Sequence, residues 1–366
     1  MAEGHRRGRR GAARARPGRR LIPTDSTATS SETPADQAGV GLSGRDSQRR
    51  ATALLPASTQ RERRLAELGV LVVMVFWAGN FIVVKGAISV LPPVGFTFLR
   101  YSIAAITLLV LLRWREGAIR LPKGDTLKIF GLGIIGFGCY QILWPVALQS
   151  IPAGDSALLI AATPVITALL AMAVGEDQPN AVKIIGAFVS FAGVALVIAA
   201  GQGLSLGVSL TGDVLTLIAA ACWSVYTVFG ASILRRHSPL VTTTWAIVAG
   251  TLFIAPLGIG QLLTSDLSGF GPPVVLAIIY SGTLAAGFAN VIVFNGVKLL
   301  GPTRVNALQF LVPVLAVGMA AVFLDEPIRA IQIVGGAVIL AGVALLRRGS
   351  WPGRGRVTHA VGSAAR

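Results

Sequence analysis

The sequence predicts an all-α integral membrane protein with ten transmembrane helices, arranged as two inverted five-helix repeats. Three observations support this prediction. The chain of 366 residues is 53% hydrophobic and only 13% charged, with a mean hydropathy of +0.71. Its apolar residues fall in runs of about 20, which is the length that a helix needs to cross a bilayer. The runs also recur at a nearly constant interval in the two halves of the chain, as expected of an internal repeat.

Prolines and glycines show the repeat most clearly. The matches that are 149 positions apart include Pro164 with Pro313, Gly186 with Gly335, Gly193 with Gly342 and Gly133 with Gly282. The beginning of each half matches at a shorter interval of 146, as Trp77 does with Trp223. We therefore place the first repeat at residues 66–200 and the second at residues 213–348.

Ten apolar segments follow one another at short intervals. They are 67–88, 94–112, 128–149, 156–174, 182–200, 213–233, 240–262, 273–296, 303–323 and 329–346. Each repeat contains five of them. Because five is an odd number, the second repeat must cross the membrane in the opposite sense to the first, which is a plan that many transporters share.

The basic charge of the chain lies mostly in its two tails. Residues 1–65 are rich in Arg, Ser and Gly with little apolar content, and we expect a disordered, basic cytoplasmic N-terminal tail. Residues 349–366 form a basic cytoplasmic C-terminal tail. The arginines between Arg6 and Arg20 would suit nucleic acid or anionic lipid, but basic tails beside a first span mainly set orientation. We therefore expect no nucleic-acid partner.

Loop charges predict the orientation. With the N-terminus inside, ten Lys and Arg residues fall in cytoplasmic loops and only Arg329 falls outside. Cytoplasmic loops carry the excess of these residues in membrane proteins. The expectation is a multi-pass protein of a bacterial inner (cell) membrane, with both termini in the cytoplasm and the lipid bilayer as its partner.

The chain resembles the EamA family of the drug/metabolite transporter (DMT) superfamily. The first half carries Trp77-Ala78-Gly79-Asn80-Phe81, Phe98-Leu99-Arg100, Ser156-Ala157 and Glu176, and the second half repeats part of this pattern with Trp223, Asn306-Ala307 and Glu326. The resemblance covers residues 67–348. It implies ten helices with cytoplasmic ends, and export or exchange of small metabolites such as amino acids, without identifying a substrate. The second half departs from the pattern because Ala231 and Ala246 replace the equivalents of Lys85 and Arg100.

Lys85 and Arg100 are charges within predicted spans. They lie seven and eight residues from Pro92, so both are expected at a similar depth, roughly 10–12 Å below the turn. Cations within a membrane are unfavourable and usually face a bundle interior or an aqueous cavity. One interpretation is a pair that binds a carboxylate or phosphate of the substrate. The alternative is that Lys85 extends to the membrane surface and Arg100 binds backbone carbonyls.

Aromatic and amide side chains recur in matched positions of the two halves. Trp77 and Asn80 in the first span correspond to Trp223 and Tyr226 in the sixth, and a spacing of three places each pair on one helix face. Such groups would suit the wall of a cavity that binds a small polar solute. The further candidates in the third and eighth spans are Tyr140, Gln141, Trp144, Asn290 and Asn295. For all of them, packing and hydrogen bonds between helices are the alternative.

Small residues and prolines within spans predict helix geometry. Pro164 and Pro313 remove a backbone donor and are expected to kink their helices, either as hinges or as fixed bends. Gly186 and Gly193, with their mates Gly335 and Gly342, form stripes that favour close helix packing. The alternative for these stripes is a homodimer face.

These patterns favour a secondary transporter that moves a small polar or amphipathic metabolite by alternating access. We expect no metal site and no cofactor, because the sequence shows no clustered metal-ligating residues. A membrane-embedded enzyme would need a catalytic constellation, which we do not find in the sequence. A sensor or structural membrane protein would not need the matched amides and aromatics. No Asp, Glu or His is placed deep within a span, so a proton carrier is not predicted.

Overall fold

The structure, a computed structural model, describes residues 60–202, 208–234 and 236–349. The predicted tails therefore lie largely outside the described residues. The chain divides into the units Met1–Ala57 and Ser58–Arg366, and all described residues belong to the second. Within the described ranges every regular element is a helix, which confirms the all-α prediction.

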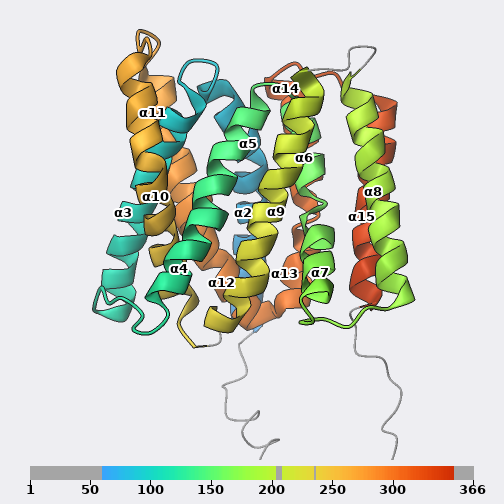
Figure 1. The fold of residues 1–366 in the computed structure, drawn as a ribbon, viewed down its shortest axis with the longest axis horizontal. Helices are drawn as coiled ribbons and strands as arrows, with labels where there is room; N and C mark the ends of the chain where they lie inside the picture. The colour runs from blue at the N-terminus through green and yellow to red at the C-terminus, as the bar shows by residue number, and fades with distance from the viewer. Residues whose placement is uncertain (1–59, 203–207, 235, 350–366) are drawn as a thin grey trace, which may run out of the picture. The chain divides into compact units, whose positions relative to one another are not determined.

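The helices follow one another in two matching series (Figure 1). The first comprises α2 (Gln60–Ala87), α3 (Pro93–Glu116), α4 (Thr126–Gly133), the π-helix η1 (Ile134–Cys139), α5 (Tyr140–Leu148), α6 (Ala153–Ile160), α7 (Thr163–Ala173) and α8 (Ala181–Gln202). The second comprises α9 (Val208–Leu234), α10 (Pro239–Thr264), α11 (Pro272–Ile279), the π-helix η2 (Tyr280–Phe288), α12 (Ala289–Leu300), α13 (Pro302–Leu308), α14 (Leu311–Phe323) and α15 (Ala330–Gly349).

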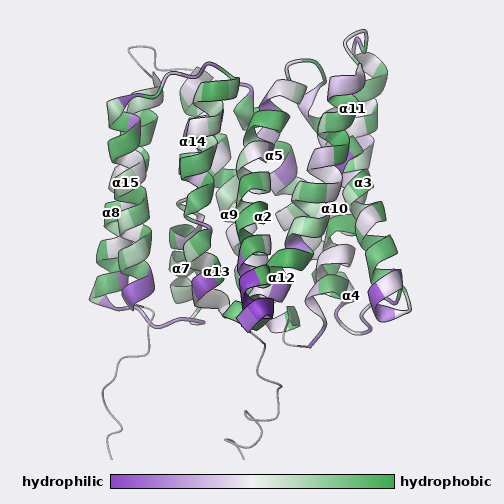
Figure 2. Cartoon of the chain, turned by 180° about the vertical axis from the view of Figure 1, so that it is seen from behind, coloured by the Kyte–Doolittle hydropathy of each residue, from purple (hydrophilic) through white to green (hydrophobic). Residues whose placement is uncertain are grey.

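Nine helical stretches in the described residues are long and apolar enough to cross a membrane. The predicted span 303–323 is not among them; it consists of α13 and the shorter apolar helix α14, separated at Gln309 and Phe310. The multi-pass membrane class is thus confirmed, whereas the count of ten spans is not. Hydrophobic residues cover the lengths of the helices in Figure 2. Large apolar side chains such as Phe188, which is 73% exposed, face outward as lipid contact requires.

Proline explains where the fourth span breaks. Pro164 has no N–H to donate to the carbonyl of Ile160, and α6 ends at that residue. The hydroxyl of Thr163 donates to the Ile160 oxygen at 2.5 Å and so replaces part of the lost bonding. A second break precedes Pro313 at the matching point, between α13 and α14. The expected irregularities at the two prolines are therefore present as breaks in the helices.

Each series also contains a π-helix in the middle of a span, which the sequence analysis did not predict. The two π-helices occupy matching positions, and η1 packs on α10 while η2 packs on α3. Glycine permits both contacts. A Cβ on Gly133, the last residue of α4 before η1, would lie 2.4 Å from the Ala246 oxygen, and a Cβ on Gly282 of η2 would lie 2.5 Å from the Arg100 oxygen. Such π-helical turns occur frequently at functional sites.

The predicted glycine stripes pack α8 against α15. A Cβ on Gly186 would lie 2.8 Å from the Gly342 oxygen, and one on Gly193 would lie 2.7 Å from the Gly335 oxygen. The contacts run in opposite order along the two helices, so α8 and α15 are antiparallel. All four glycines are thus used within one chain, and they do not form a free face for a second copy.

Candidate functional site

A buried polar network surrounds Arg100 in α3. The side chain is 2% exposed and is among the largest fully buried side chains. Its Nη1 donates to the hydroxyl of Ser281 at 2.9 Å, and its Nη2 donates to the amide oxygen of Gln141. The Ser281 hydroxyl in turn donates to the Asn80 amide oxygen at 2.6 Å. The network therefore connects α2, α3, α5 and η2.

The guanidinium of Arg100 has only neutral hydrogen-bond partners. No carboxylate in the described residues forms a salt bridge with it, and its Nε is buried without a hydrogen-bond partner. Its carbon Cζ lies 4.9 Å from the ring centroid of Tyr101 and 5.5 Å from that of Trp144, close enough for cation–π attraction. A buried cation without a counter-ion is costly, so this position favours the binding of an anionic group.

Local backbone geometry makes the network possible. The close approach of η2 to Arg100 depends on Gly282, and the adjacent Ser281 is thereby brought within reach of the guanidinium. The matching contact in the other half joins Gly133 to Ala246, where no side chain can form such bonds. The two halves thus share the backbone contact but not the charge.

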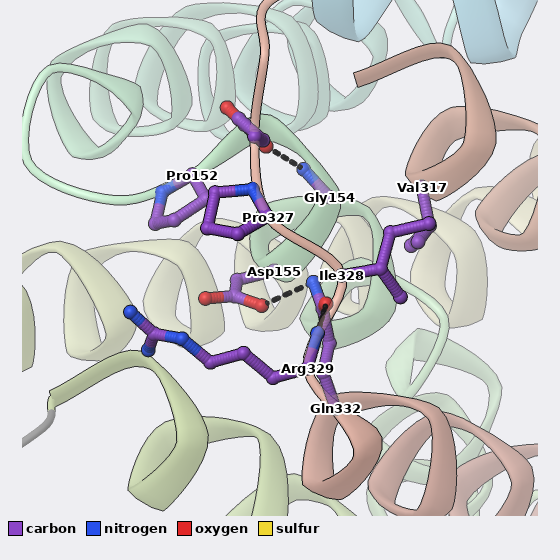
Figure 3. Close-up of a pocket in the computed structure, with 9 residues that line it drawn as sticks. Pro152, Gly154, Asp155, Val317, Pro327, Ile328, Arg329 and Gln332 are labelled. Atoms are coloured by element: carbon purple, nitrogen blue, oxygen red, sulfur yellow. Dashed lines mark hydrogen bonds between the residues drawn. The ribbon is translucent and has the colours of Figure 1, made fainter. Parts of the chain in front are cut away.

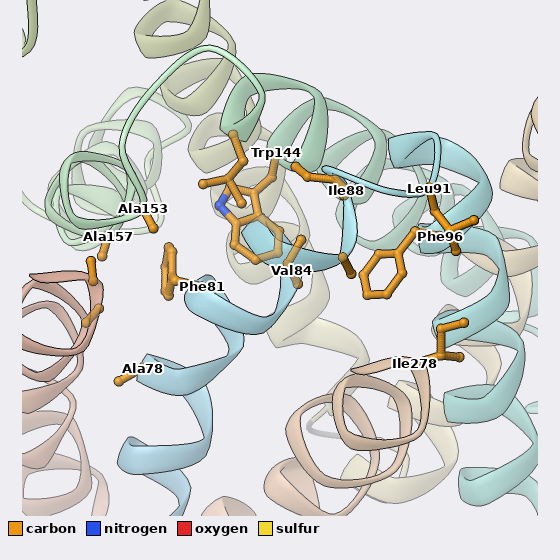
Figure 4. Close-up of a cluster of buried hydrophobic side chains, with 14 of the residues drawn as sticks. Ala78, Phe81, Val84, Ile88, Leu91, Phe96, Trp144, Ala153, Ala157 and Ile278 are labelled. Carbon is orange, nitrogen blue, oxygen red and sulfur yellow. The ribbon is translucent and has the colours of Figure 1, made fainter. Parts of the chain in front are cut away.

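Predicted aromatic residues form a continuous cluster beside Arg100. The ring of Trp144 stacks on Tyr140 at 6.4 Å between centroids, and Tyr140 lies 5.7 Å from Trp223. Trp223 continues to Tyr226 at 5.4 Å, and Phe137 of η1 contacts both of these rings. Trp144 also belongs to the apolar core in Figure 4. Six sequence candidates therefore meet through direct contacts: Arg100, Tyr140, Gln141, Trp144, Trp223 and Tyr226. Asn80 joins them through the Ser281 hydroxyl.

Other candidates make separate contacts. The indole of Trp77 donates to the Ala285 oxygen of η2 at 3.0 Å. Asn290 donates to the Ala286 oxygen, one turn earlier in the same helical stretch, and Asn295 is partly buried in α12. None of the described contacts joins these three residues to Arg100. A role for them in solute binding remains a prediction.

The charged end of Lys85 lies at another level than that of Arg100. Its ammonium donates to the Leu148 oxygen, and to the Ile151 oxygen at 2.7 Å, whereas Arg100 contacts Gln141. Leu148 follows Gln141 by seven residues in α5, or about 10 Å along a helix. The charged ends of the two side chains therefore contact different levels of α5. Backbone carbonyls bind Lys85, a contact that the sequence analysis had considered for Arg100.

Comparison with known proteins decides the family. The pattern of the EamA-like transporter family matches residues 64–199 and again residues 210–348. The chain belongs to this family. The resemblance drawn from the sequence motifs and the prediction of a membrane transporter are both confirmed.

Relatives of this EamA-like transporter come from archaea and bacteria. A transporter of Archaeoglobus fulgidus is 30% identical over 274 residues, covering 74% of this chain and 93% of the relative. A protein of Streptantibioticus cattleyicolor named "Probable terminal-alkyne amino-acid exporter" is 29% identical, with 75% and 91% covered. A "Probable amino-acid metabolite efflux pump" of Salmonella typhimurium is 28% identical, with the same coverage.

A solved crystal structure shares the fold of this EamA-like transporter. It has 20% sequence identity and a TM-score of 0.57, and the match covers 77% of this chain and 98% of that one. At this identity the likeness supports the fold alone.

The sequence analysis missed Asp155 as a buried acid of the transporter. It lies in the first turn of α6, within a candidate span, and is 4% exposed. Its Oδ1 accepts a hydrogen bond from Gln332 of α15 at 2.7 Å, beside Arg329 and a cavity of about 50 Å³ (Figure 3). The expectation concerned acids deep within a span, whereas Asp155 lies in the first turn of its span, close to the end of the bundle. Because the fourth span was predicted at 156–174, Asp155 fell one residue outside it. Ser281 gave no signal, because serine is common in helices.

Proposed function

We propose that this protein is a secondary transporter that exports or exchanges small amphipathic solutes bearing a carboxylate, such as amino acids, by alternating access. The observation that carries the proposal is the buried Arg100 guanidinium with neutral partners and an unbonded Nε. Two relatives whose printed names refer to amino-acid export are consistent with it. The family match makes the chain a transporter, and the arginine suggests the chemistry of its solute.

The solute would bind between the guanidinium and the aromatic cluster. A carboxylate can accept charge-assisted hydrogen bonds from Arg100, and such bonds are stronger than those to neutral partners such as Ser281 and Gln141. The rings of Tyr140, Trp144 and Trp223 would contact the apolar part of the same molecule. This combination favours an amphipathic solute over an inorganic anion. Arg100 is closed to solvent in this structure, so release requires another conformation.

Alternating access would use the inverted halves. Reciprocal contacts support this arrangement, because Gly133 meets Ala246 while their sequence mates Gly282 and Arg100 also meet. The helices α8 and α15 are sequence mates as well, and they pack antiparallel through matched glycines. Mates that contact each other reciprocally are what a two-fold axis between repeats produces. We propose ten crossings on this basis, with α13 and α14 together forming the ninth.

The basic loops orient the proposed transporter. Arg113, Arg120 and Lys123 belong to the end of the helices that would face the cytoplasm, together with both chain termini. The membrane would be the cell membrane of a bacterium. Solute would then leave at the opposite end, where α5 finishes and α6 begins.

The first test is a thermal-shift comparison of the purified wild-type protein with Arg100→Gln and Arg100→Lys. A ligand that binds only the folded protein raises the Tm by mass action, by an amount equivalent to about 2.7 kcal/mol at 100 times Kd. Amino acids and matched carboxylates should raise the wild-type Tm, and Arg100→Gln should reduce the shift. The exposed Arg113→Gln, in the same helix, should keep it. An equal shift in Arg100→Gln would contradict the proposed site.

A transport assay distinguishes a transporter from a sensor. Proteoliposomes loaded with a stabilising amino acid should exchange it for labelled solute outside, and Arg100→Gln should lower the initial rate at least tenfold. Binding without any flux in the wild-type protein would favour a sensor and would contradict transport of that solute.

A further inference from the structure

Lys85 and Glu326 line the same cavity at the end of the bundle where α2 finishes and α6 begins. Lys85 is in the last turn of α2, in the first half of the chain. Glu326 belongs to the segment between α14 and α15, in the second half. The cavity, of about 520 Å³, is open to the surface, and the polar side chains of Ser89, Gln149 and Ser150 are also part of its lining.

Backbone groups position both charges. Lys85 donates to the oxygens of Leu148 and Ile151, and since an ammonium has three N–H groups, one is left for a ligand. The carboxylate of Glu326 accepts from the Ala153 N–H at 2.7 Å and from the Gly154 N–H at 3.1 Å. These are the first N–H groups of α6, where a negative charge is favourable. Each carboxylate oxygen still has a free lone-pair direction.

The two charges do not neutralise each other by contact. In the described part of the chain neither Lys85 nor Glu326 takes part in a salt bridge, although the carboxylate is the charged group that acts electrostatically on Lys85. A cation and an anion therefore face one open cavity with space between them. A ligand that carries both charges can satisfy both groups at once.

We propose that this cavity is a second solute site, specific for amino acids in their zwitterionic form. The ligand carboxylate would bind the ammonium of Lys85, and the ligand ammonium would bind the carboxylate of Glu326. The inference deepens the proposed function, because it assumes an amino-acid solute, but it concerns residues distinct from those around Arg100. Transported solute would pass this site at the proposed outer end of the protein.

Selectivity distinguishes this site from a general anion site. A simple carboxylate would be attracted by Lys85 but repelled by Glu326. A simple amine would be attracted by Glu326 but repelled by Lys85. Only a molecule with both groups at a short separation gains both attractions. Alanine should therefore bind more tightly than either propionate or ethylamine, which each contain one of its two charged groups.

The test measures binding of these three compounds by calorimetry to full-length Arg100→Gln protein, so that carboxylate binding at Arg100 does not contribute. Alanine should bind at least tenfold more tightly than propionate and ethylamine. Adding Glu326→Gln should lower alanine affinity to that of propionate without weakening propionate. Adding Lys85→Met should lower it to that of ethylamine without weakening ethylamine. The exposed Glu176→Gln and Lys123→Met should change nothing.

Two results would overturn the inference. One is that alanine shows no advantage, or no binding, in the folded Arg100→Gln protein. The other is that Glu326→Gln and Lys85→Met weaken all three compounds equally, which would mean that they only hold the backbone together. If Arg100→Gln does not fold, the same comparison in wild-type protein uses the ratio of alanine to propionate affinity, which Glu326→Gln should reduce to one. Loss of exchange in Arg100→Gln tests the proposed function separately, because that residue is not part of this cavity.

Discussion

The role of a charged residue in this protein depends on its hydrogen-bond partners more than on its own charge. Arg100 and Lys85 are both cations within spans, yet Arg100 is bound by two neutral side chains and Lys85 by two backbone carbonyls. The first arrangement leaves one guanidinium nitrogen unsatisfied, whereas the second uses most of the ammonium's donors. This difference makes Arg100 the stronger candidate for solute recognition in the centre of the protein.

Removing the Ser281 hydroxyl tests the network at Arg100. Ser281→Ala leaves the buried Nη1 without a partner, which should cost about 1–3 kcal/mol of folding free energy. We expect a lower Tm for the unliganded protein, measured in detergent. Ser102→Ala is the matched control, because that hydroxyl bonds only to the Phe98 oxygen of its own helix, and its Tm should stay close to that of the wild type. Equal Tm values for both variants would contradict the described role of Ser281.

Several helices in this protein pack closely at positions where glycine leaves out a side chain. The pair α8 and α15 shows this most clearly, because backbone atoms of one helix lie where a Cβ of the other would be. Prolines act at the same scale, because a helix break lies just before Pro164 in α7 and just before Pro313 in α14. The hinge interpretation predicts that these breaks move during transport.

Alanine substitutions separate packing glycines from neutral ones. A Cβ at position 342 would lie 2.4 Å from the Ser190 nitrogen and 2.6 Å from the Gly186 oxygen, so Gly342→Ala must push α8 and α15 apart. Such overpacking typically costs about 1–3 kcal/mol. Gly318 in α14 has no atom within 4 Å of that position, and Gly318→Ala should stabilise by about 0.5–1 kcal/mol through backbone entropy. A comparable loss of Tm in both variants would contradict this packing.

The whole molecule is proposed to have one orientation in the membrane. In a background with Cys139→Ser and Cys222→Ser, a cysteine introduced as Gln202→Cys should react with a membrane-impermeant reagent added outside intact cells. Lys123→Cys should react only after permeabilisation. Ten basic residues in the loops at the proposed inner end give the physical reason. The opposite labelling pattern would invert the proposed direction of export.

Local sequence patterns were sufficient for the class, the family and the positions of nine spans in the described residues. Hydrophobic length alone places a helix in a bilayer, and the repeat of prolines and glycines depends only on residue spacing. The observed α10, Pro239–Thr264, lies within two residues of the segment predicted at 240–262. Aromatic and amide candidates were also found in this way, because matched residues in two halves are visible without coordinates.

The pairing of residues across the fold depended on tertiary contacts. Ser281 and Arg100 are 181 positions apart, and Glu326 meets the start of α6 across 173 positions. Lys85 contacts Leu148 at the end of α5, whereas Arg100 contacts Gln141 seven residues earlier. Asp155 is buried against Gln332 of α15, 177 positions away. Periodicity specifies which face a residue occupies, but its partner depends on how neighbouring helices are offset along their axes. That offset results from packing among all the helices and is not encoded in any one of them.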